Sequence, residues 1–419
     1  MRILVCAQQA PLPPQNGFSL QVAALLAELR KQHEVRLVAV AFPDQDLRGL
    51  QGDWTRLVPI RSAWRVGGVA RRMTAASRGY AFSPRELAAR LGGPVHHELE
   101  RFRPDVVHVA GSNLAMLGRE LTHCVALLAP LDAAFINADA RVLCAVGTRR
   151  WLLRREAKRV RRFEATEYRR FRRVVVVSRE DAAALRGLDP TLRPVVIPNG
   201  VDLTAFSPDP HSIRDRDRVI FAGVMSAAPN VSAAEFLARV VMPRVRVEVP
   251  AAHLVIVGRE PTVAVRRLSR LPSVEVVGEV EDMRAWLTSS SVCACPMISG
   301  TGIKNKLLEA MASGLPCVVT PLTLRGVAAM PGRDVLVGED ANRLAAHVAF
   351  LLRDRSAARS IGAAGRAYVV SNHAWRGVGE AYVRVYESLV AEAGRTPDAR
   401  DPSATCGERA HRRPGYVPP

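Results

Sequence analysis

The segment GTGIKNKLLEAMASGLPCVVT (300–320) places two glycines, two lysines and a glutamate within ten residues, directly after an apolar run. Its apolar residues recur at helical spacing over 304–313, so the pattern predicts a strand, a glycine-rich turn and a helix. A helix that begins at such a turn leaves its first backbone N–H groups unbonded, and these form an anion site. Lysines near this end are unfavourable against the helix dipole, which indicates that Lys304 and Lys306 meet a negatively charged ligand.

A simpler interpretation of the same residues is an ion pair on a helix surface. Lys306 and Glu309 are three residues apart, a spacing at which opposite charges stabilise a helix by about 0.2–0.5 kcal/mol. Glycine turns before helices are also common in doubly wound folds. From these residues alone, the phosphate site and the surface pair both stay open.

The composition restricts the class of protein. The chain has 419 residues, of which 48% are hydrophobic and 24% charged, which is typical of a globular protein large enough for two domains. No apolar run approaches the length of about 18 residues that a membrane span needs, and the first residues predict a strand, not a secretory signal. The seven cysteines include no CxxC pair and most lie in apolar runs, which predicts reduced cysteines in a cytoplasmic protein.

The net charge of +19 favours negatively charged partners. The densest basic block, 149–173, carries a broken apolar stripe on an otherwise basic helix. This helix could lie on an anionic surface at the inner face of the membrane, or its stripe could face the protein's own sheet, which is the interpretation we favour. Aromatic residues make up only 5% of the chain and no nucleic-acid-binding motif occurs, so we expect no nucleic-acid partner.

Strand-like apolar runs alternate with helical patterns through both halves of the chain. The runs lack polar alternation, as expected for parallel sheets covered on both faces, and they predict two doubly wound α/β domains. The predicted segments are an N-terminal domain (1–198), a linker (199–217), a second domain (218–370), closing helices (371–394) and a disordered tail (395–419).

Ligands of such sheets bind beyond the carboxyl ends of the strands. In the second half, Gly223 and Gly278 are among the glycines that follow predicted strands, and they would let a base and a diphosphate approach the backbone. In the first half, His108 ends the third predicted strand and Asp132 follows the fourth, so both could face an interdomain cleft. Taken alone, these residues are better interpreted as a structural histidine and a helix N-cap. The first loop ends at Gly17 but lacks the GxGxxG pattern of a dinucleotide site.

We expect neither a metal centre nor a cofactor. The triplet Asp215-Arg216-Asp217 has the form of a DxD motif, but it lies in the charged linker and is interpreted as solvated. No HExxH pattern and no cluster of histidines and carboxylates appears in the sequence.

Taken together, the motifs resemble glycosyltransferase family 4, whose GT-B fold has two Rossmann-like domains facing across a cleft. The second half is most similar to the sugar transferases of bacterial polysaccharide systems. The resemblance also implies a C-terminal helix that returns toward the N-terminal domain. The matching segments are IPNGVDLTAFSP, FAGVMSAAPN, LVIVGREP, VVGEVED, the segment 300–320 and Trp375.

The resemblance implies that the second domain holds a nucleotide-diphosphate sugar. Glu309 stands at the second glutamate of the family's E-x7-E motif and would accept hydrogen bonds from the ribose hydroxyls. Gly302 and the helix N-terminus would hold the diphosphate, with Lys304 or Lys306 offsetting its charge, which favours the phosphate site over the surface pair.

Further donor contacts are implied for Gly223, for Gly278 and Val280 beside the base, and for Gly17 from the opposite domain. Two features depart from the family pattern. Thr301, which we also expect at the donor site, replaces the first glutamate of the motif. The arginine/lysine pair that many members carry after the first strand of this domain is missing.

The resemblance implies a retaining, metal-independent glycosyltransferase in which Asp132 or His108 orients the acceptor hydroxyl. The replacement at Thr301 motivates an alternative, a catalytically silent nucleotide-sugar-binding or scaffold protein of a polysaccharide assembly. A nucleotide-sugar epimerase and a basic nucleic-acid-binding module are weaker alternatives. The sequence identifies neither the base nor the sugar, nor the acceptor, which could be lipid-linked.

Overall fold

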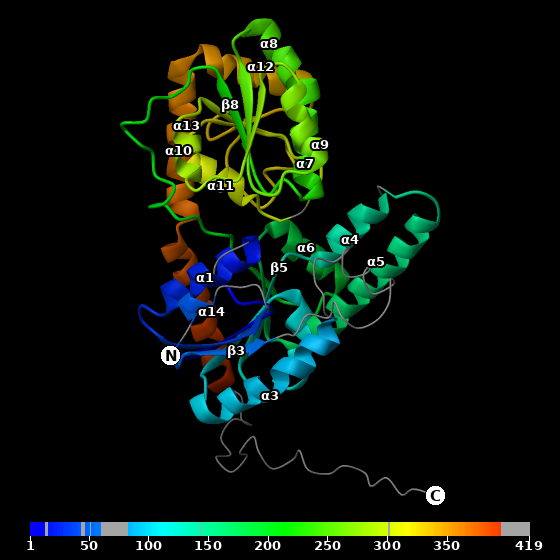
Figure 1. The fold of residues 1–419 in the computed structure, drawn as a ribbon. Coiled ribbons are helices and arrows are strands. Elements are labelled where there is room, and N and C mark those ends of the chain that lie inside the picture. Colours follow the sequence, from blue (N-terminus) through cyan, green and yellow to red (C-terminus); the bar gives the residue numbers. More distant parts are fainter. Residues whose placement is uncertain are drawn as a thin grey trace, which may run out of the picture.

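The computed structural model describes residues 1–12, 16–42, 47–50, 52–59, 83–143, 145–300 and 302–394. The tail predicted from residue 395 and the predicted site residue Thr301 lie outside the described residues. Figure 1 shows two α/β domains connected by the chain between β7 and β8 and by the helices at its C-terminal end.

The N-terminal domain is built on a seven-stranded parallel sheet with the order β3-β2-β1-β4-β5-β6-β7. Alternate side chains of the central strand β1 enter different cores, with Ile3 and Val5 on one face and Leu4 and Cys6 on the other. Both faces are therefore covered, as the continuous apolar runs predicted. The strands are β1 (Arg2–Ala7), β2 (Glu34–Ala41), β3 (Thr55–Pro59), β4 (Val106–Ala110), β5 (Ala126–Leu131), β6 (Arg173–Val176) and β7 (Pro194–Val196).

The helices of this domain lie on both faces of the sheet and include a long pair, α4 and α5, that projects from its side (Figure 1). The sequence did not predict β3, an edge strand whose segment TRLVP is short and partly polar. The helical segments are α1 (Gly17–Leu29), η1 (Arg48–Leu50), α3 (Pro84–Phe102), η3 (Ser112–Arg119), α4 (Ala134–Leu143), α5 (Gly147–Glu167), η4 (Tyr168–Arg170) and α6 (Arg179–Leu188).

The second domain has a six-stranded parallel sheet with the order β10-β9-β8-β11-β12-β13. Its strands are β8 (Arg218–Ala222), β9 (His253–Val257), β10 (Val274–Gly278), β11 (Val292–Cys295), β12 (Cys317–Val319) and β13 (Leu336–Val337). Its helical segments are α7 (Ala228–Phe236), η5 (Leu237–Val241), α8 (Met242–Glu248), α9 (Val263–Arg266), η6 (Arg267–Arg270), α10 (Met283–Thr288), α11 (Asn305–Ala312), α12 (Ala341–Arg353) and α13 (Arg355–Asn372).

The chain crosses between the domains twice, and the two crossings lie side by side. Val201 forms a bridge with Ala374, and its backbone N–H donates to the carbonyl of His373 at 2.8 Å. Gly200 packs so closely on the ring of Trp375 that a Cβ there would lie 2.5 Å from it. The two crossings therefore form one connection, fixed by an aromatic ring and backbone hydrogen bonds.

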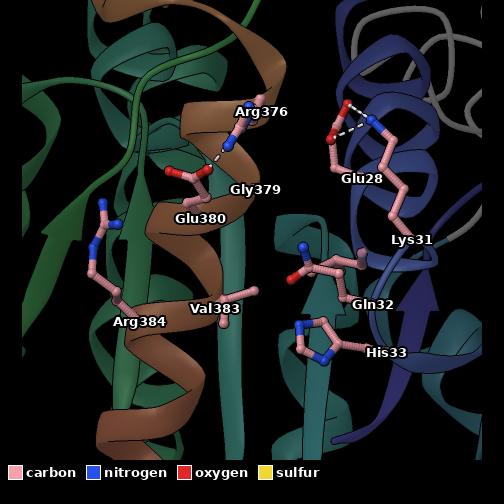
Figure 2. A pocket seen from close by; sticks show the side chains of 10 residues that line it. Glu28, Lys31, Gln32, His33, Arg376, Gly379, Glu380, Val383 and Arg384 are labelled. Carbon is pink, nitrogen blue, oxygen red and sulfur yellow. Dashed lines mark hydrogen bonds and ion pairs between the residues drawn. The ribbon is translucent and has the colours of Figure 1, made fainter.

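The last helix, α14 (Trp375–Gly394), returns to the N-terminal domain, where Tyr382 and Tyr386 are buried in its core. Figure 2 shows α14 running beside the end of α1, with Arg376 and Glu380 on one side of a groove and Glu28 on the other. The prediction of two Rossmann-like domains with a returning C-terminal helix is thus confirmed.

Candidate functional site

A hollow of about 650 Å³ opens between the two domains, at the carboxyl ends of strands in the second sheet. In the N-terminal domain, the start of α1 lines the hollow. In the second domain, the loops after β8, β9 and β10 line it together with α11. The structure brings together six of the predicted site residues as lining of this hollow: Gly17, Gly223, Val280, Lys304, Lys306 and Glu309.

One glycine on the floor of the hollow, Gly258, could not be replaced without moving the backbone. Gly258 has a φ of +149°, and a Cβ there would lie 1.7 Å from the carbonyl oxygen of Gly223. Gly278 does not line the hollow, but its carbonyl accepts a 2.7 Å hydrogen bond from the N–H of Gly258. The strand ends are thus fastened to one another, and backbone forms a surface that a flat ligand can approach.

Lys304 lies at the N-terminus of α11 and is only 8% exposed. Its ammonium group donates to the carbonyl of Gly302 at 2.7 Å, and burial lowers the pKa of Lys304 to about 8. Gly302 has a φ of +71°, the left-handed region that favours glycine, and so provides the turn into the helix. The ammonium group is therefore fixed at the helix end, and its pKa lies close to neutral pH.

Lys306 reaches the same place from the first turn of α11. Its ammonium group donates to the side-chain oxygen of Asn230 and lies 4.8 Å from the centroid of the Phe221 ring. Burial lowers the pKa of Lys306 below its usual value. The structure records no ion pair between Lys306 and Glu309 among the residues it describes, so the interpretation of these two residues as a surface pair is wrong.

Glu309 lies in the second turn of α11 and faces the hollow. Burial raises the pKa of this carboxyl to about 7, and the positive charge of Lys306 partly opposes that shift. No side chain caps α11, so the positive end of this helix also faces the cleft. One short helix thus presents two cations and its own N-terminus at one end, and a hydrogen-bond acceptor one turn further on.

On the opposite side, Asp132 faces the turn that precedes α11. A Cβ on Gly302 would lie 3.6 Å from the Oδ2 atom of Asp132, and the side chain of Asn137 donates to the same oxygen at 3.3 Å. Asp132 therefore lies at the interdomain cleft, as the sequence predicted, although it is not among the residues that line the hollow.

Two buried carboxylates hold the loop that carries Asp132. Asp181 accepts the backbone N–H of Ala133 at 3.1 Å, and Glu164 accepts those of Ala134 and Phe135 at 2.9 and 3.3 Å. The preceding Leu131 has a φ of +77°, a conformation that costs a residue with a side chain on the order of 1 kcal/mol. Such a conformation persists only where its surroundings fix it, and these carboxylates do so.

His108 does not face the cleft, so its predicted catalytic role is wrong. It is the middle residue of β4 and is buried, with its Nδ1 atom 2.7 Å from the hydroxyl of Tyr386 and its ring 5.3 Å from that of Tyr382. Burial lowers the pKa of His108 to about 3, so it stays neutral in the core. The sheet face that it occupies is the one that α14 covers.

The sequence did not predict several residues of the site. Asn230 holds Lys306, and Arg259, directly after β9 and Gly258, lines the hollow as a third cation. Asn305 opens α11, accepts a 3.1 Å hydrogen bond from Asn199 at the domain connection, and would lie 3.5 Å from a Cβ on Gly17. The rule that ligands bind at strand ends could have identified Arg259, but the partners of the asparagines are too distant in sequence.

The groove in Figure 2 is a different feature. It is lined by Glu28, His33 and part of α14, at the opposite end of α1 from Gly17 and the cleft. Its Glu28 and Glu380 carboxylates are already paired with Lys31 and Arg376. It therefore contributes nothing to the interdomain site.

The described residues contain neither a cluster of metal ligands nor a helix that could span a membrane. No group of three or more histidine, cysteine or carboxylate side chains in this part of the chain could hold a metal ion. None of its helices is long and apolar enough to cross a membrane.

The two domains match models of known families. Residues 15–205 match the model described as Glycosyltransferase Family 4, and residues 216–354 match the model described as Glycosyl transferases group 1. The matches cover most of the chain and divide it near the linker. No curated protein matches the sequence.

Solved structures share the fold at low sequence identity. Sucrose-phosphate synthase from Thermosynechococcus elongatus superimposes with a TM-score of 0.71 at 16% identity, over 94% of this chain and 100% of that one. HepE from Anabaena, in complex with UDP, gives 0.65 at 14% identity, over 93% and 100%. WaaG, a glycosyltransferase involved in lipopolysaccharide biosynthesis, gives 0.61 at 15% identity, over 92% and 99%. The chain therefore has the GT-B architecture.

Proposed function

The chain belongs to the family 4 glycosyltransferases, and from this we propose that it transfers a sugar from a nucleotide-diphosphate sugar to an acceptor hydroxyl with retention of anomeric configuration. The observation that carries the proposal is the set of charges on α11. Lys304, Lys306 and the uncapped helix N-terminus converge where a diphosphate would lie, and Glu309 lies one turn beyond them.

The spacing fits the parts of a nucleoside diphosphate. The diphosphate lies against Lys304, Lys306 and the first amides of α11, while the vicinal hydroxyls of the ribose donate to Glu309. The base lies along Val280, on backbone of the strand ends. HepE was solved in complex with UDP and in complex with UDP-glucose, which supports a nucleotide sugar as the donor here. The identity of the base is a question for experiment.

In the proposed reaction, the bond between the anomeric carbon and the leaving phosphate oxygen breaks while the acceptor oxygen bonds to the same carbon from the same face. The acceptor proton passes to the leaving phosphate, and the products are a glycoside and a nucleoside diphosphate. Charge develops on the departing diphosphate, so cations fixed beside it stabilise the transition state more than the ground state. Lys304 and Lys306 supply that charge, and on this basis the reaction needs no metal ion.

Asp132 is the group we assign to the acceptor. Its carboxylate faces the Gly302 turn and can accept a hydrogen bond from the attacking hydroxyl, which orients the oxygen toward the sugar. We propose that the acceptor is a growing polysaccharide or a glycolipid and that the reaction takes place in the cytoplasm.

The test is incubation of the purified protein with UDP-, GDP-, ADP- and dTDP-sugars and a panel of sugar and glycolipid acceptors. Release of a nucleoside diphosphate, with a product whose anomeric configuration matches the donor by NMR, supports the proposal. Nucleotide-sugar binding without turnover across all acceptors favours the silent binding or scaffold protein that the loss of the motif glutamate at Thr301 motivates. Inversion of configuration overturns the retaining mechanism.

A further inference from the structure

The tip of the α4–α5 hairpin carries apolar side chains that the described part of the protein leaves exposed. Of the twelve large apolar side chains that are exposed among the described residues, four lie here: Leu143 at 77%, Val146 at 84%, Trp151 at 56% and Leu152 at 59%. These four residues, which we call the hairpin tip, come from the end of α4, the connection and the first turns of α5. An apolar group of this kind at the end of a projecting pair of helices marks an interaction surface (Figure 1).

Basic side chains surround the hairpin tip along the exposed side of α5. Two of the basic residues fasten the hairpin, because Arg141 pairs with Glu156 and Arg161 pairs with Asp139. A larger set is exposed and forms no recorded ion pair within the described part of the chain: Arg149, Arg150, Arg154, Arg155, Lys158, Arg159 and Arg162.

Helical spacing puts charge and apolar area on the same face. Arg155 and Lys158 stand four and seven residues after Trp151, and Arg155 lies over the Trp151 ring at 4.7 Å from its centroid. The apolar stripe predicted for this helix packs against α4 near the tip, and further along it joins the core on one face of the sheet through Val160 and Tyr168, as we favoured from the sequence. The outward face is therefore available to a partner.

We propose that the hairpin tip docks the protein on an anionic lipid bilayer. The seven exposed cations complement acidic headgroups, and an indole with flanking aliphatic side chains is suited to the boundary between headgroups and acyl chains. A nucleic acid would be attracted by the same cations but would leave Leu143, Val146 and Leu152 in water. A bilayer accommodates both features, so it is the partner to which the chemistry points.

The position of the hairpin relates this docking surface to the cleft. Helix α4 starts two residues after Asp132, and its ten residues span about 15 Å to the tip. A bilayer at the tip thus lies within reach of a lipid-linked acceptor whose headgroup enters the cleft. This last step rests on the proposed function, whereas the docking itself does not depend on it.

The experiment measures by co-sedimentation how the full chain binds to vesicles. The vesicles consist of phosphatidylcholine with or without about 30% phosphatidylglycerol, at about physiological ionic strength. We expect binding to the anionic vesicles alone, and weakening as salt rises. Arg154→Glu with Arg155→Glu lowers the apparent affinity by roughly 25-fold or more, since each basic side chain near such a surface contributes about fivefold. Trp151→Ser with Leu152→Ser lowers it by roughly tenfold or more.

The matched control is Arg266→Glu with Arg267→Glu, an identical change of net charge on exposed arginines of the second domain. Val263, 62% exposed nearby, allows the corresponding Val263→Ser control for an apolar side chain. Both controls retain wild-type affinity within about threefold if the hairpin tip is the docking site. Equal loss in the control and the tip variants, equal binding to vesicles without phosphatidylglycerol, or binding to duplex DNA but not to vesicles overturns the proposal.

Fluorescence supplies an independent readout of insertion. Wild-type emission shifts to shorter wavelength on anionic vesicles because Trp151 leaves water, whereas Trp151→Phe keeps most of the binding and loses the shift. An unchanged shift in Trp151→Phe contradicts docking through the tip. Nucleotide binding by the same protein preparations is measured by calorimetry without vesicles. This measurement distinguishes a failure of the docking proposal from a failure of the proposed function.

Discussion

The two sides of the cleft are built in different ways. The side that belongs to the second domain, which we call the donor rim, points its charged groups into the hollow: Lys304, Lys306 and Glu309 all come from one strand–turn–helix segment. The opposite side, the acceptor rim, consists of the loop 131–134 with Glu164 and Asp181 behind it. On this side the buried carboxylates accept hydrogen bonds from backbone N–H groups, and Asp132 is the acidic side chain that reaches the cleft.

The difference shows that burial of charged groups has a different role on each side of the cleft. On the donor rim, the buried charged groups face the hollow and can contact a ligand. Burial lowers the pKa of Lys304 to about 8 and raises the pKa of Glu309 to about 7. On the acceptor rim, burial also raises the pKa of Glu164 to about 7, but this carboxyl already accepts backbone N–H groups and the hydroxyl of Tyr168. The same perturbation therefore marks a binding group in one place and a positioning group in the other.

The largest effect should come from removing a charge on the donor rim. Lys306→Met keeps most of the length of the side chain but removes the cation beside the leaving diphosphate, so kcat/KM falls by roughly 10²–10³. Steady-state kinetics measures the loss, with Lys31→Met, an exposed lysine that follows α1, as the control that leaves activity unchanged. A change of less than about threefold in Lys306→Met would remove this lysine from the catalytic machinery.

An acceptor-rim substitution should separate turnover from donor binding. Glu164→Ala leaves the N–H groups of Ala134 and Phe135 unpaired, so it lowers the free energy of unfolding by about 1–3 kcal/mol and lowers kcat as Asp132 loses its position. The affinity for the nucleoside diphosphate stays unchanged. Chemical denaturation, calorimetry and kinetics on one preparation measure all three quantities.

Glu167→Ala is the matched control for that experiment. Glu167 is also buried on α5, but it pairs with Arg119 and Arg170 and has no recorded hydrogen bond to the loop 131–134. Its loss destabilises the fold without a specific effect on kcat. If both variants lower kcat equally, Glu164 acts through stability alone and its positioning role is refuted.

The affinity for the nucleoside diphosphate should depend on pH with a maximum between about 7 and 8. Above the lowered pKa of Lys304 the free protein loses this cation, so affinity falls by up to about tenfold per pH unit until the bound form also deprotonates. Below the raised pKa of Glu309 the carboxyl is protonated and accepts the ribose hydroxyls less well. Calorimetry across pH measures both limbs; Lys304→Arg should flatten the alkaline limb and Glu309→Gln the acid limb, and unchanged limbs would contradict the assignment.

The smallest effect on activity is expected at His108. His108→Phe leaves the hydroxyl of Tyr386 without its partner, which costs about 1–3 kcal/mol of stability, but kcat changes by less than about twofold because the residue faces the core. In the wild type, unfolded His108 binds a proton below about pH 6.5 while the folded residue, with a pKa of about 3, does not. The stability that the neutral histidine contributes is therefore present above pH 6.5 and falls as the pH decreases toward 3, and the His108→Phe substitution removes that part of the dependence. Denaturation at a series of pH values measures it, and an unchanged pH dependence in the variant would contradict the assignment.

The contrast between the rims also explains what the sequence could predict. The donor rim is encoded locally, since the turn, the helix start and the charges follow one another within 300–309, and the same holds for the parallel sheets with their continuous apolar runs. The acceptor rim depends on Glu164 and Asp181, which are far from Asp132 in sequence and whose roles follow only from tertiary contacts. His108 was misplaced because a residue near a strand end was taken to face the cleft, while the register of β4 turns it toward α14.

The central claim, that α11 holds a nucleoside diphosphate, is tested most directly by calorimetric titration of UDP, GDP, ADP and dTDP into the wild type and Glu309→Ala. The account predicts saturable binding of one diphosphate and a loss of at least about tenfold in affinity in the variant, because two hydroxyl hydrogen bonds to a buried carboxylate are lost. Equal affinity of Glu309→Ala and the wild type, or no binding of any diphosphate to the folded protein, would contradict it.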